Sequence, residues 1–217
     1  MWTPRLFVTR PLAAAFAAAS LVAWLPGAAQ AVPAEDTTRI ALQAGWRYQP
    51  NGRFAEWTAM SGYPMTSKIT GGPTLLFIFA YRPMPEIEVA LEVGWAFERF
   101  SFENAKPMQL NQIPITAAVR YAPFAGSIFP YVGVGYGYML NFFTDAPGGT
   151  VESHGSTPVL IAGGSLELSD RISINLEYRY TLCRVELTNL GYMQAGGNSL
   201  YLGVSLAFPP EDKRRIK

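Results

Sequence analysis

The sequence predicts an all-β protein: a single eight-stranded antiparallel up-and-down transmembrane β-barrel. Three observations point to it. Only 15% of residues are charged while 49% are hydrophobic, against about 25% charged in an ordinary soluble domain. Residues 1–31 have the pattern of an export signal, and the rest of the chain lacks the run of about 18 apolar residues that a spanning helix requires. That remainder alternates between apolar and polar residues, and a closed barrel is the other structure that satisfies its backbone in lipid.

Composition also excludes several classes of protein. The formal net charge of +1 and the absence of an overall basic bias argue against a nucleic-acid binder. The single cysteine, Cys183, excludes an intrachain disulfide framework, and the single histidine, His154, excludes a histidine-rich metal site. We therefore expect no metal and no cofactor.

Residues 1–31 are interpreted as a secretory signal peptide. Arg5 and Arg10 make its start positive, residues 12–25 are rich in alanine and leucine, and Ala29-Gln30-Ala31 has the small-x-small pattern of a cleavage site after Ala31. The alternative, a membrane anchor, is disfavoured because the apolar run is shorter than the ~20 residues of a spanning helix. The expected organisation is signal peptide 1–31, barrel 32–208 and a short polar periplasmic tail 209–217.

Eight segments after residue 31 alternate with the two-residue period of a β-strand. Each approaches the ~9–11 residues of a tilted spanning strand. The clearest covers residues 87–97, with Val93 on one face and Glu88 and Glu92 on the other. Residues 74–82 are the least amphipathic, because both faces are mainly apolar. The predicted strands are residues 39–48, 74–82, 87–97, 113–121, 131–142, 159–168, 172–181 and 199–208.

The predicted connections alternate between short and long. This arrangement is typical of an outer-membrane barrel, with short turns in the periplasm and long loops outside. An even number of strands returns both termini to the periplasm. Ten strands, with an extra hairpin inside residues 49–71, is the alternative. The short connections are residues 83–86, 122–129 and 169–171, and the long ones are residues 49–71, 101–112, 143–156 and 182–197.

The apolar face could point inward, as in a soluble lipocalin-like barrel, or outward to lipid. Aromatic residues favour the membrane barrel, because they gather near both ends of the predicted strands, as rings do at the lipid headgroups. The polar face is also rich in small residues and poor in lysine, which suits a narrow lumen. The expected outer belt is Trp46, Tyr48, Trp95, Phe97, Tyr138, Phe142, Tyr178 and Tyr180, and the inner belt is Tyr81, Tyr121, Tyr131 and Phe208.

Four stretches carry a family resemblance: IPITAAVRY at 113–121, FPYVGVGYGY at 129–138, LEYRY at 176–180 and YLGVSLAF at 201–208. With them the chain resembles the small outer-membrane barrels of Gram-negative bacteria, the OmpA-, OmpX- and OmpW-like proteins. The resemblance implies the cell outer membrane and insertion by the barrel-insertion machinery through the strand ending at Phe208. The chain departs from that pattern by continuing to residue 217.

The strand positions that are predicted to face inward include several charged residues, which would meet in the lumen. An eight-stranded barrel is only just wide enough for side chains, and buried charges must be paired or hydrated. We expect a structural ion-pair plug. The alternatives are a gate whose ion pairs exchange to open a narrow polar path, and a small cavity beside Gly133, Gly135 and Gly137. The predicted lumen network is Arg47, Arg82, Glu88, Glu92, Arg120, Glu167, Glu177 and Arg179.

Enzyme signatures are nearly absent, and no catalytic residue is predicted. His154, Ser156 and Glu167 resemble the His-x-Ser and glutamate pattern of a lipid A deacylase, but their parity places Glu167 on the opposite face of a regular strand. We expect His154 to be an exposed loop histidine and Cys183 a free, inert thiol near the outer rim.

The predicted function is that of an integral outer-membrane protein with a plugged polar lumen and a structural or surface-interaction role. The resemblance implies an alternative, a narrow OmpW-like channel for small hydrophobic molecules. A lipid A-modifying enzyme is the second alternative. The expected partners are outer-membrane lipid, lipopolysaccharide and the insertion machinery, with no nucleic acid, and the protein is expected to be a monomer.

Overall fold

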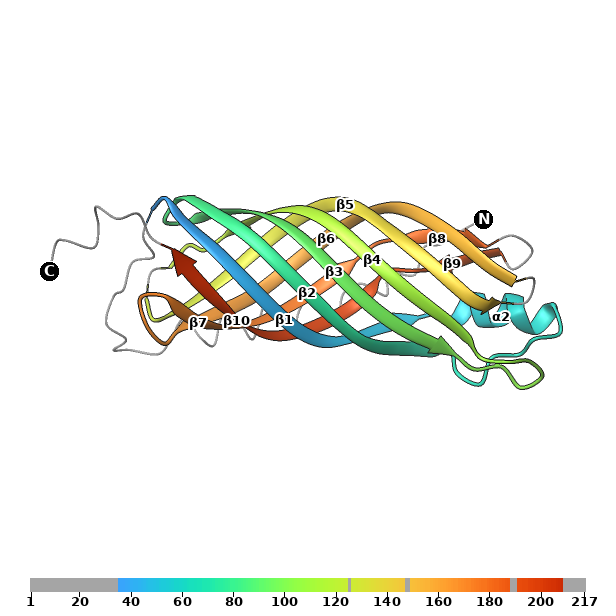
Figure 1. Cartoon of the computed structure of the whole chain (residues 1–217). Helices are drawn as coiled ribbons and strands as arrows, with labels where there is room; N and C mark the ends of the chain where they lie inside the picture. The colour runs from blue at the N-terminus through green and yellow to red at the C-terminus, as the bar shows by residue number, and fades with distance from the viewer. Residues whose placement is uncertain (1–34, 125, 147–148, 188–190, 209–217) are drawn as a thin grey trace, which may run out of the picture.

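A computed structural model describes residues 35–124, 126–146, 149–187 and 191–208. In this part of the chain eight antiparallel strands close into a barrel (Figure 1). The predicted signal peptide 1–31 and tail 209–217 lie outside the described residues. No helix among the described residues is long and apolar enough to cross a membrane.

All eight predicted segments are strands of the barrel. Each strand pairs with its neighbour along the chain, apart from the short elements between β7 and β10, and the β1–β10 pair closes the barrel from Thr38 opposite Phe208 to Tyr48 opposite Asn198. The strands are β1 (Thr37–Pro50), β2 (Ile69–Met84), β3 (Ile87–Phe100), β4 (Met108–Tyr121), β5 (Ile128–Ala146), β6 (Gly149–Glu167), β7 (Ile172–Thr181) and β10 (Gly197–Phe208).

The apolar face of the sheet points outward. Val93, Leu176 and Val204 are 41%, 54% and 55% exposed, whereas Glu92 and Glu177 are 1% and 0% exposed. A soluble barrel would show the reverse distribution, because its apolar face would fill the interior. The outward aliphatic surface therefore suits hydrocarbon, and the polar residues turn toward the barrel axis.

The two ends of the barrel differ. At one end β1 begins, β10 ends and the connections are short; we call it the turn end (left in Figure 1). The opposite, loop end carries the helix α2 (Gly52–Met60) and the hairpin of β8 (Arg184–Leu187) and β9 (Gly191–Gln194). The alternative of an extra barrel hairpin within residues 49–71 is wrong, because that segment forms α2. The additional hairpin lies within residues 182–197 and forms a separate two-stranded sheet.

Several strands extend further toward the loop end than the sequence predicted. β5 and β6 continue through most of the predicted loop 143–156 and pair as far as Ala146 opposite Gly149, with a register shift after Phe143. β7 stops earlier, at Thr181 opposite Val159, so the loop half of β6 projects beyond it. The turn after β7 begins with a hydrogen bond from the Leu182 N–H to the Pro158 carbonyl oxygen at 2.9 Å.

An apolar cluster closes the barrel interior at the loop end, and we call it the apolar cap. Helix α2 contributes Phe54, whose ring packs edge-on against Phe100 with centroids 6.1 Å apart. The hairpin contributes from the other side, so the cap joins both irregular segments to the barrel wall. Its buried members are Phe54, Phe100, Phe102, Met108, Leu110, Met139, Phe143, Cys183, Val185, Met193 and Ala195.

The predicted belt residues divide into two groups. Most face outward and are at least partly exposed, and Trp95 stacks on Phe97 with centroids 6.4 Å apart. Tyr131 was wrongly placed in the inner belt: it is buried inside the barrel, because it shares the inward parity of Gly133 on β5. The outward residues are Trp46, Tyr48, Trp95, Phe97, Tyr138, Phe142, Tyr178, Tyr180, Tyr81, Tyr121 and Phe208.

A charged side chain on the outward face should lower the free energy of unfolding, and the loss should be larger the deeper the residue lies in the membrane. Leu202 points outward in the middle of β10, so Leu202→Arg should lower the free energy of unfolding in lipid vesicles by about 2–4 kcal/mol. Ile69→Arg, at the loop end of β2, should cost at most about 1 kcal/mol. Reversible denaturant unfolding followed by tryptophan fluorescence measures both changes. Equal costs at the two positions would contradict the outward orientation.

Candidate functional site

Buried arginine and glutamate side chains meet inside the turn half of the barrel. They project from β1, β2, β3, β4 and β7, and each glutamate contacts at least two arginines. The two-residue alternation of each strand turns these side chains inward, and the register of the strands then brings them together. This lumen network consists of Arg39, Arg82, Glu88, Glu92, Arg120, Glu177 and Arg179.

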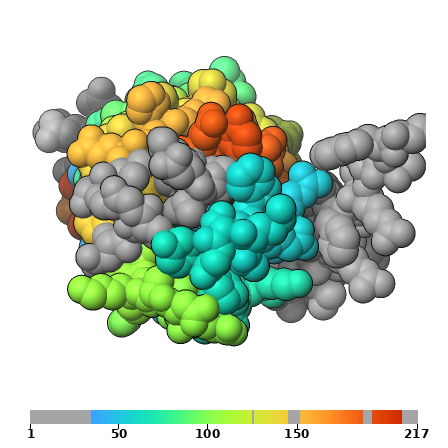
Figure 2. Space-filling view, turned by 90° about the vertical axis from the view of Figure 1, so that its right-hand side faces the viewer, coloured from blue at the N-terminus to red at the C-terminus, as the bar shows by residue number. Residues whose placement is uncertain are grey.

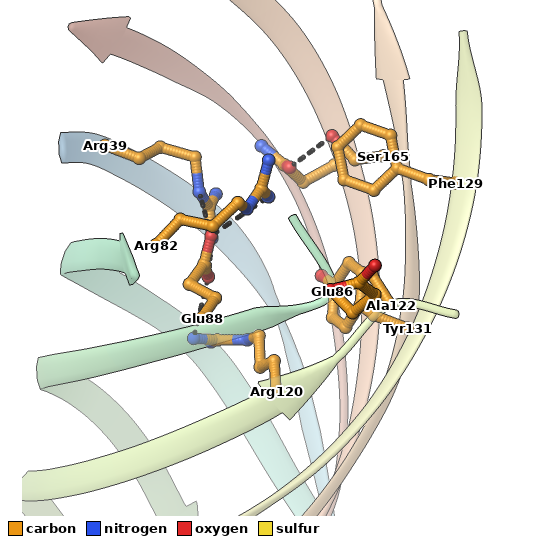
Figure 3. Close-up of a pocket in the computed structure, with 10 residues that line it drawn as sticks. Arg39, Arg82, Glu86, Glu88, Arg120, Ala122, Phe129, Tyr131 and Ser165 are labelled. Carbon is orange, nitrogen blue, oxygen red and sulfur yellow. Dashed lines mark hydrogen bonds and ion pairs between the residues drawn. The ribbon is translucent and has the colours of Figure 1, made fainter. Parts of the chain in front are cut away.

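Three arginines converge on Glu88 near the turn end (Figure 3). Arg39 binds it through two N–H groups, Nε to Oε2 at 2.9 Å and Nη2 to Oε1 at 2.5 Å. Arg82 and Arg120 approach the same carboxylate at 3.3 and 3.4 Å. Four strands, β1 to β4, are thus tied to one buried charge.

Arg120 links this group to the middle of the barrel. Its Nη2 pairs with Glu92, and its Nε and Nη2 donate to Glu177 Oε2 at 3.3 and 3.2 Å. Arg179 completes the arrangement from β7, with Nη1 and Nη2 at 2.6 and 2.8 Å from Glu92 and Nε at 2.5 Å from Glu177. Two arginines therefore share two carboxylates, and such charge-assisted hydrogen bonds offset the cost of burying the charges.

Inward aromatic rings and glycines fit around the network. The Tyr131 hydroxyl donates to Glu177 Oε2 at 2.8 Å, and its ring lies 5.8 Å from the Arg120 guanidinium carbon. The Arg179 guanidinium carbon lies 5.7 Å from the Tyr201 ring. A Cβ at Gly163 would lie 2.7 Å from the end of the Tyr131 ring, so this glycine leaves the space that the ring fills.

The predicted lumen residues have three outcomes. The prediction that Glu167 belongs to the lumen network is wrong. This residue ends β6, is only half-buried, and takes part in none of the ion pairs found among the described residues. Arg47 is buried but contacts Gln112 and no carboxylate within 4.0 Å among those residues. Arg39 was missed, although it shares the parity of Arg47. The predicted residues that do lie in the network are Arg82, Glu88, Glu92, Arg120, Glu177 and Arg179.

A layer of hydrogen-bonded polar side chains separates the network from the apolar cap. Gln112 Nε2 donates to Asn141 Oδ1 at 2.8 Å and to the Ala195 carbonyl oxygen at 2.8 Å. Gln49 Nε2 donates to the same carbonyl oxygen at 2.6 Å. These bonds fasten the segment after β9 to β1 and β4, so the hairpin is held to the barrel from inside.

Two small cavities lie inside the described part of the barrel. One cavity of about 10 Å³ lies at the turn end beside Arg82 and Tyr131, and another of about 20 Å³ lies in mid-barrel beside Arg47 and Arg179. A single water molecule needs roughly 10–15 Å³ measured in this way. No group of three or more histidine, cysteine, aspartate or glutamate residues that could hold a metal occurs in the part of the chain that the structure describes.

The residues of the possible deacylase pattern do not meet. His154 lies on β6, faces outward and stacks on Tyr138 with centroids 5.3 Å apart, so its placement in a loop was wrong. Glu167 ends the same strand, thirteen residues further on. At about 3.3 Å per residue the two are separated by roughly 40 Å, which is too far for one catalytic site.

Cys183 lies in the apolar cap as a free, buried cysteine. Burial raises the pKa of its thiol, against a smaller lowering from a hydrogen bond with Thr157. A raised pKa keeps the thiol protonated, and the thiol is less nucleophilic than the thiolate.

Comparison with known proteins agrees with this geometry. The family model described as outer membrane protein beta-barrel domain matches residues 14–208. No curated protein matches the chain.

Three solved structures show the same fold at low sequence identity. OprG from Pseudomonas aeruginosa has a TM-score of 0.53 at 14% identity, over 82% of this chain and 100% of that chain. The attachment invasion locus protein Ail of Yersinia pestis, solved with the heparin analogue sucrose octasulfate, has a TM-score of 0.51 at 14% identity, over 80% and 99%. Neisserial surface protein A has a TM-score of 0.50 at 13% identity, over 80% and 97%.

Removal of the central arginine should destabilise the barrel strongly. Arg120→Met leaves Glu88, Glu92 and Glu177 short of one cation, and breaking a buried ion pair in this way costs about 3–5 kcal/mol. Arg171→Met, in the exposed turn between β6 and β7, should change the free energy of unfolding by no more than about 0.5 kcal/mol. Denaturant titration of the two variants measures the difference, and a loss below 1 kcal/mol for Arg120→Met would show that the network does not support the fold.

Proposed function

The chain belongs to the outer membrane β-barrel domain family and lies in the outer membrane of a Gram-negative bacterium, and from this premise we propose that it is a barrel with a closed lumen that acts through its surface. The observation that carries the proposal is the filling of the barrel interior. Seven paired charged side chains occupy the turn half, and two cavities of about 10 and 20 Å³ leave room for little more than single waters.

The loop end supports the same proposal. The α2 segment, the β3–β4 connection and the β8–β9 hairpin lie across this end (Figure 2), above the apolar cap. A solute would have to displace both the cap and the polar layer beneath it before it reached the network. The role of the protein is therefore assigned to surfaces that the closed barrel presents.

The loop end presents apolar and aromatic side chains. On α2, Trp57 is 52% and Met60 is 87% exposed. On the hairpin, Tyr192 lies under Arg184, with the guanidinium carbon 4.2 Å from the ring centroid. Tryptophan, tyrosine and arginine are the residues that most often carry binding energy in interfaces, so this end suits contact with a partner.

The proposed partners follow from the outward aliphatic face and from the end of β10. The outward aliphatic face contacts outer-membrane lipid, with lipopolysaccharide around the loop end. The end of β10, with an outward Phe208, is the strand proposed to be read by the barrel-insertion machinery. A closed ladder leaves no barrel edge for pairing with a second chain, which supports a monomer, and no role with nucleic acid is proposed.

A narrow passage for small hydrophobic molecules is the second candidate function. Its supporting observation is the apolar lining of the loop half, where Met108, Leu110 and Met139 point inward. A lipid A-modifying activity is not proposed, because His154 and Glu167 are far apart.

The purified barrel should be electrically silent. In planar bilayers the wild-type protein should give no discrete conductance steps, because the paired charges block a hydrated path. Steady conductance from heat-resistant, folded protein would contradict the closed lumen.

A hydrophobic dye that reports its entry into vesicles tests the second candidate on the same preparation. Faster entry with wild-type protein than with empty vesicles, without conductance steps, would favour the passage over the surface role.

Loss of the exposed apolar residues of α2 should weaken attachment. Cells that display the variant Trp57→Ser with Met60→Ser should be retained several-fold less on protein-coated surfaces than cells displaying the wild type. Phe124→Ser, which removes an exposed aromatic at the turn end, is the matched control and should leave retention unchanged. Equal retention of all three strains at equal surface expression would reject the surface role of α2.

A further inference from the structure

The mid-barrel cavity lies between two arginines. Arg47 of β1 and Arg179 of β7 line it, together with the hydroxyl-bearing Thr116 and Thr181. Its volume of about 20 Å³ suits one water or one monatomic ion.

Arg47 is a buried cation that lacks a direct counter-charge. It is 2% exposed, its Nη1 donates to the Gln112 side-chain oxygen, and its Nε has no hydrogen-bond partner among the described residues. Glu98 is buried nearby, but its Oε1 also has no partner there and it forms no ion pair with Arg47 within 4.0 Å. The two charges therefore do not neutralise each other by contact.

The strand register places Arg47 and Arg179 on either side of Ser199. Arg47 pairs with Ser199 across β1–β10, and Ser199 pairs with Arg179 across β10–β7. At about 4.8 Å per strand, the two arginine Cα atoms are roughly 10 Å apart on the same face of the sheet. The Ser199 hydroxyl between them is buried and also has no partner among the described residues. Ser199 is not among the residues that line the cavity, so the register shows how close the two arginines lie and does not place Ser199 at the site.

The charge balance of the interior favours an anion in the mid-barrel cavity. The lumen network contains four arginines and three glutamates. Arg47 and the buried Glu98 add one charge of each sign, so one cation remains in excess among these residues. Glu92 borders the cavity, but it is already shared between Arg120 and Arg179. A water molecule would supply hydrogen bonds without charge, whereas an anion supplies both and offsets the cost of an unpaired buried cation.

We propose that this cavity binds a small monovalent anion of the size of chloride. The guanidinium N–H groups of Arg47 and Arg179 and the hydroxyls of Thr116 and Thr181 are its donors. The anion completes the buried ion network and stabilises the barrel. The cavity is too small for sulfate or phosphate, so selectivity is set by size. The proposal is independent of the closed lumen, because an anion-stabilised barrel could be silent or conducting.

The test measures the unfolding temperature of full-length protein refolded in detergent, as sodium chloride replaces sodium gluconate at constant ionic strength. The wild type should show a saturable rise in unfolding temperature with chloride and bromide. In Arg47→Gln, which keeps the polar stem and removes the charge, the halide concentration for half of the rise should increase at least tenfold.

Glu98→Gln is the matched control. It removes a buried charge from the same polar layer without touching the cavity, so it should keep the halide response or reach half of it at lower concentration. An equal effect of gluconate and chloride on the wild type, or an unchanged halide response in Arg47→Gln, would overturn the proposal in favour of water. If Arg47→Gln does not refold, anomalous diffraction from wild-type crystals soaked in bromide provides the test. We expect an anomalous peak between Arg47 and Arg179, and its absence at saturating bromide would overturn the proposal.

Discussion

The structure depends on one constraint: a charged or hydrogen-bonding group cannot be left unpaired in hydrocarbon. For the backbone the constraint is met by closing eight strands into one ladder, from the β1–β2 hairpin to the β1–β10 pair. For the side chains it is met by turning every strand so that Glu88, Glu92 and Arg120 face the axis. Because the period of a strand is two, this single choice fixes the direction of every other side chain as well.

Space inside so narrow a barrel is limited, and the inward side chains of neighbouring strands are matched in size. Where Tyr131 and Arg120 cross the lumen, the facing positions on the adjacent strands are Gly163 and Gly133, at which a Cβ would come within 2.7 and 3.1 Å of those side chains. Large residues opposite glycines let rings lie against guanidinium groups, and Arg82, Arg120 and Arg179 each contact both a carboxylate and an aromatic ring. The glycine-rich pattern of β5 therefore shapes the ionic interior.

The sequence predicted the eight strands and their inward faces, because both depend on the same local alternation. It placed Tyr131 in a belt because an aromatic ring suits either a headgroup region or a cramped lumen, and only parity separates the two. The apolar cap was not predicted, for a related reason. At Met108 and Leu110 the alternation is inverted, because the apolar residues point inward and the polar Gln109 and Asn111 lie on the other face. Contacts such as that between Phe54 and Phe100 also join segments that no local pattern connects. Pairing within the lumen, such as Arg39 with Glu88, likewise depends on the register of distant strands.

The barrel interior has an ionic half and an apolar half. A physical reason for this division lies in the export of the chain to the outer membrane. A strand that is apolar on both faces is also a run of apolar residues, and a run of about 18 to 20 would be taken for a spanning helix before it reached the outer membrane. β2 is apolar on both faces over a short run, because Leu76 and Ile78 point inward and are buried while Phe77 and Phe79 face outward. Arg82 ends that run. In β2, β3 and β7 the inward charges thus break up sequences that the lipid-facing side requires to be apolar. The ion pairs among them offset the cost of burying those charges in the folded barrel. The members of the apolar cap are contributed by α2, by several strands and by the β8–β9 hairpin, so the apolar half of the interior is distributed over many short segments.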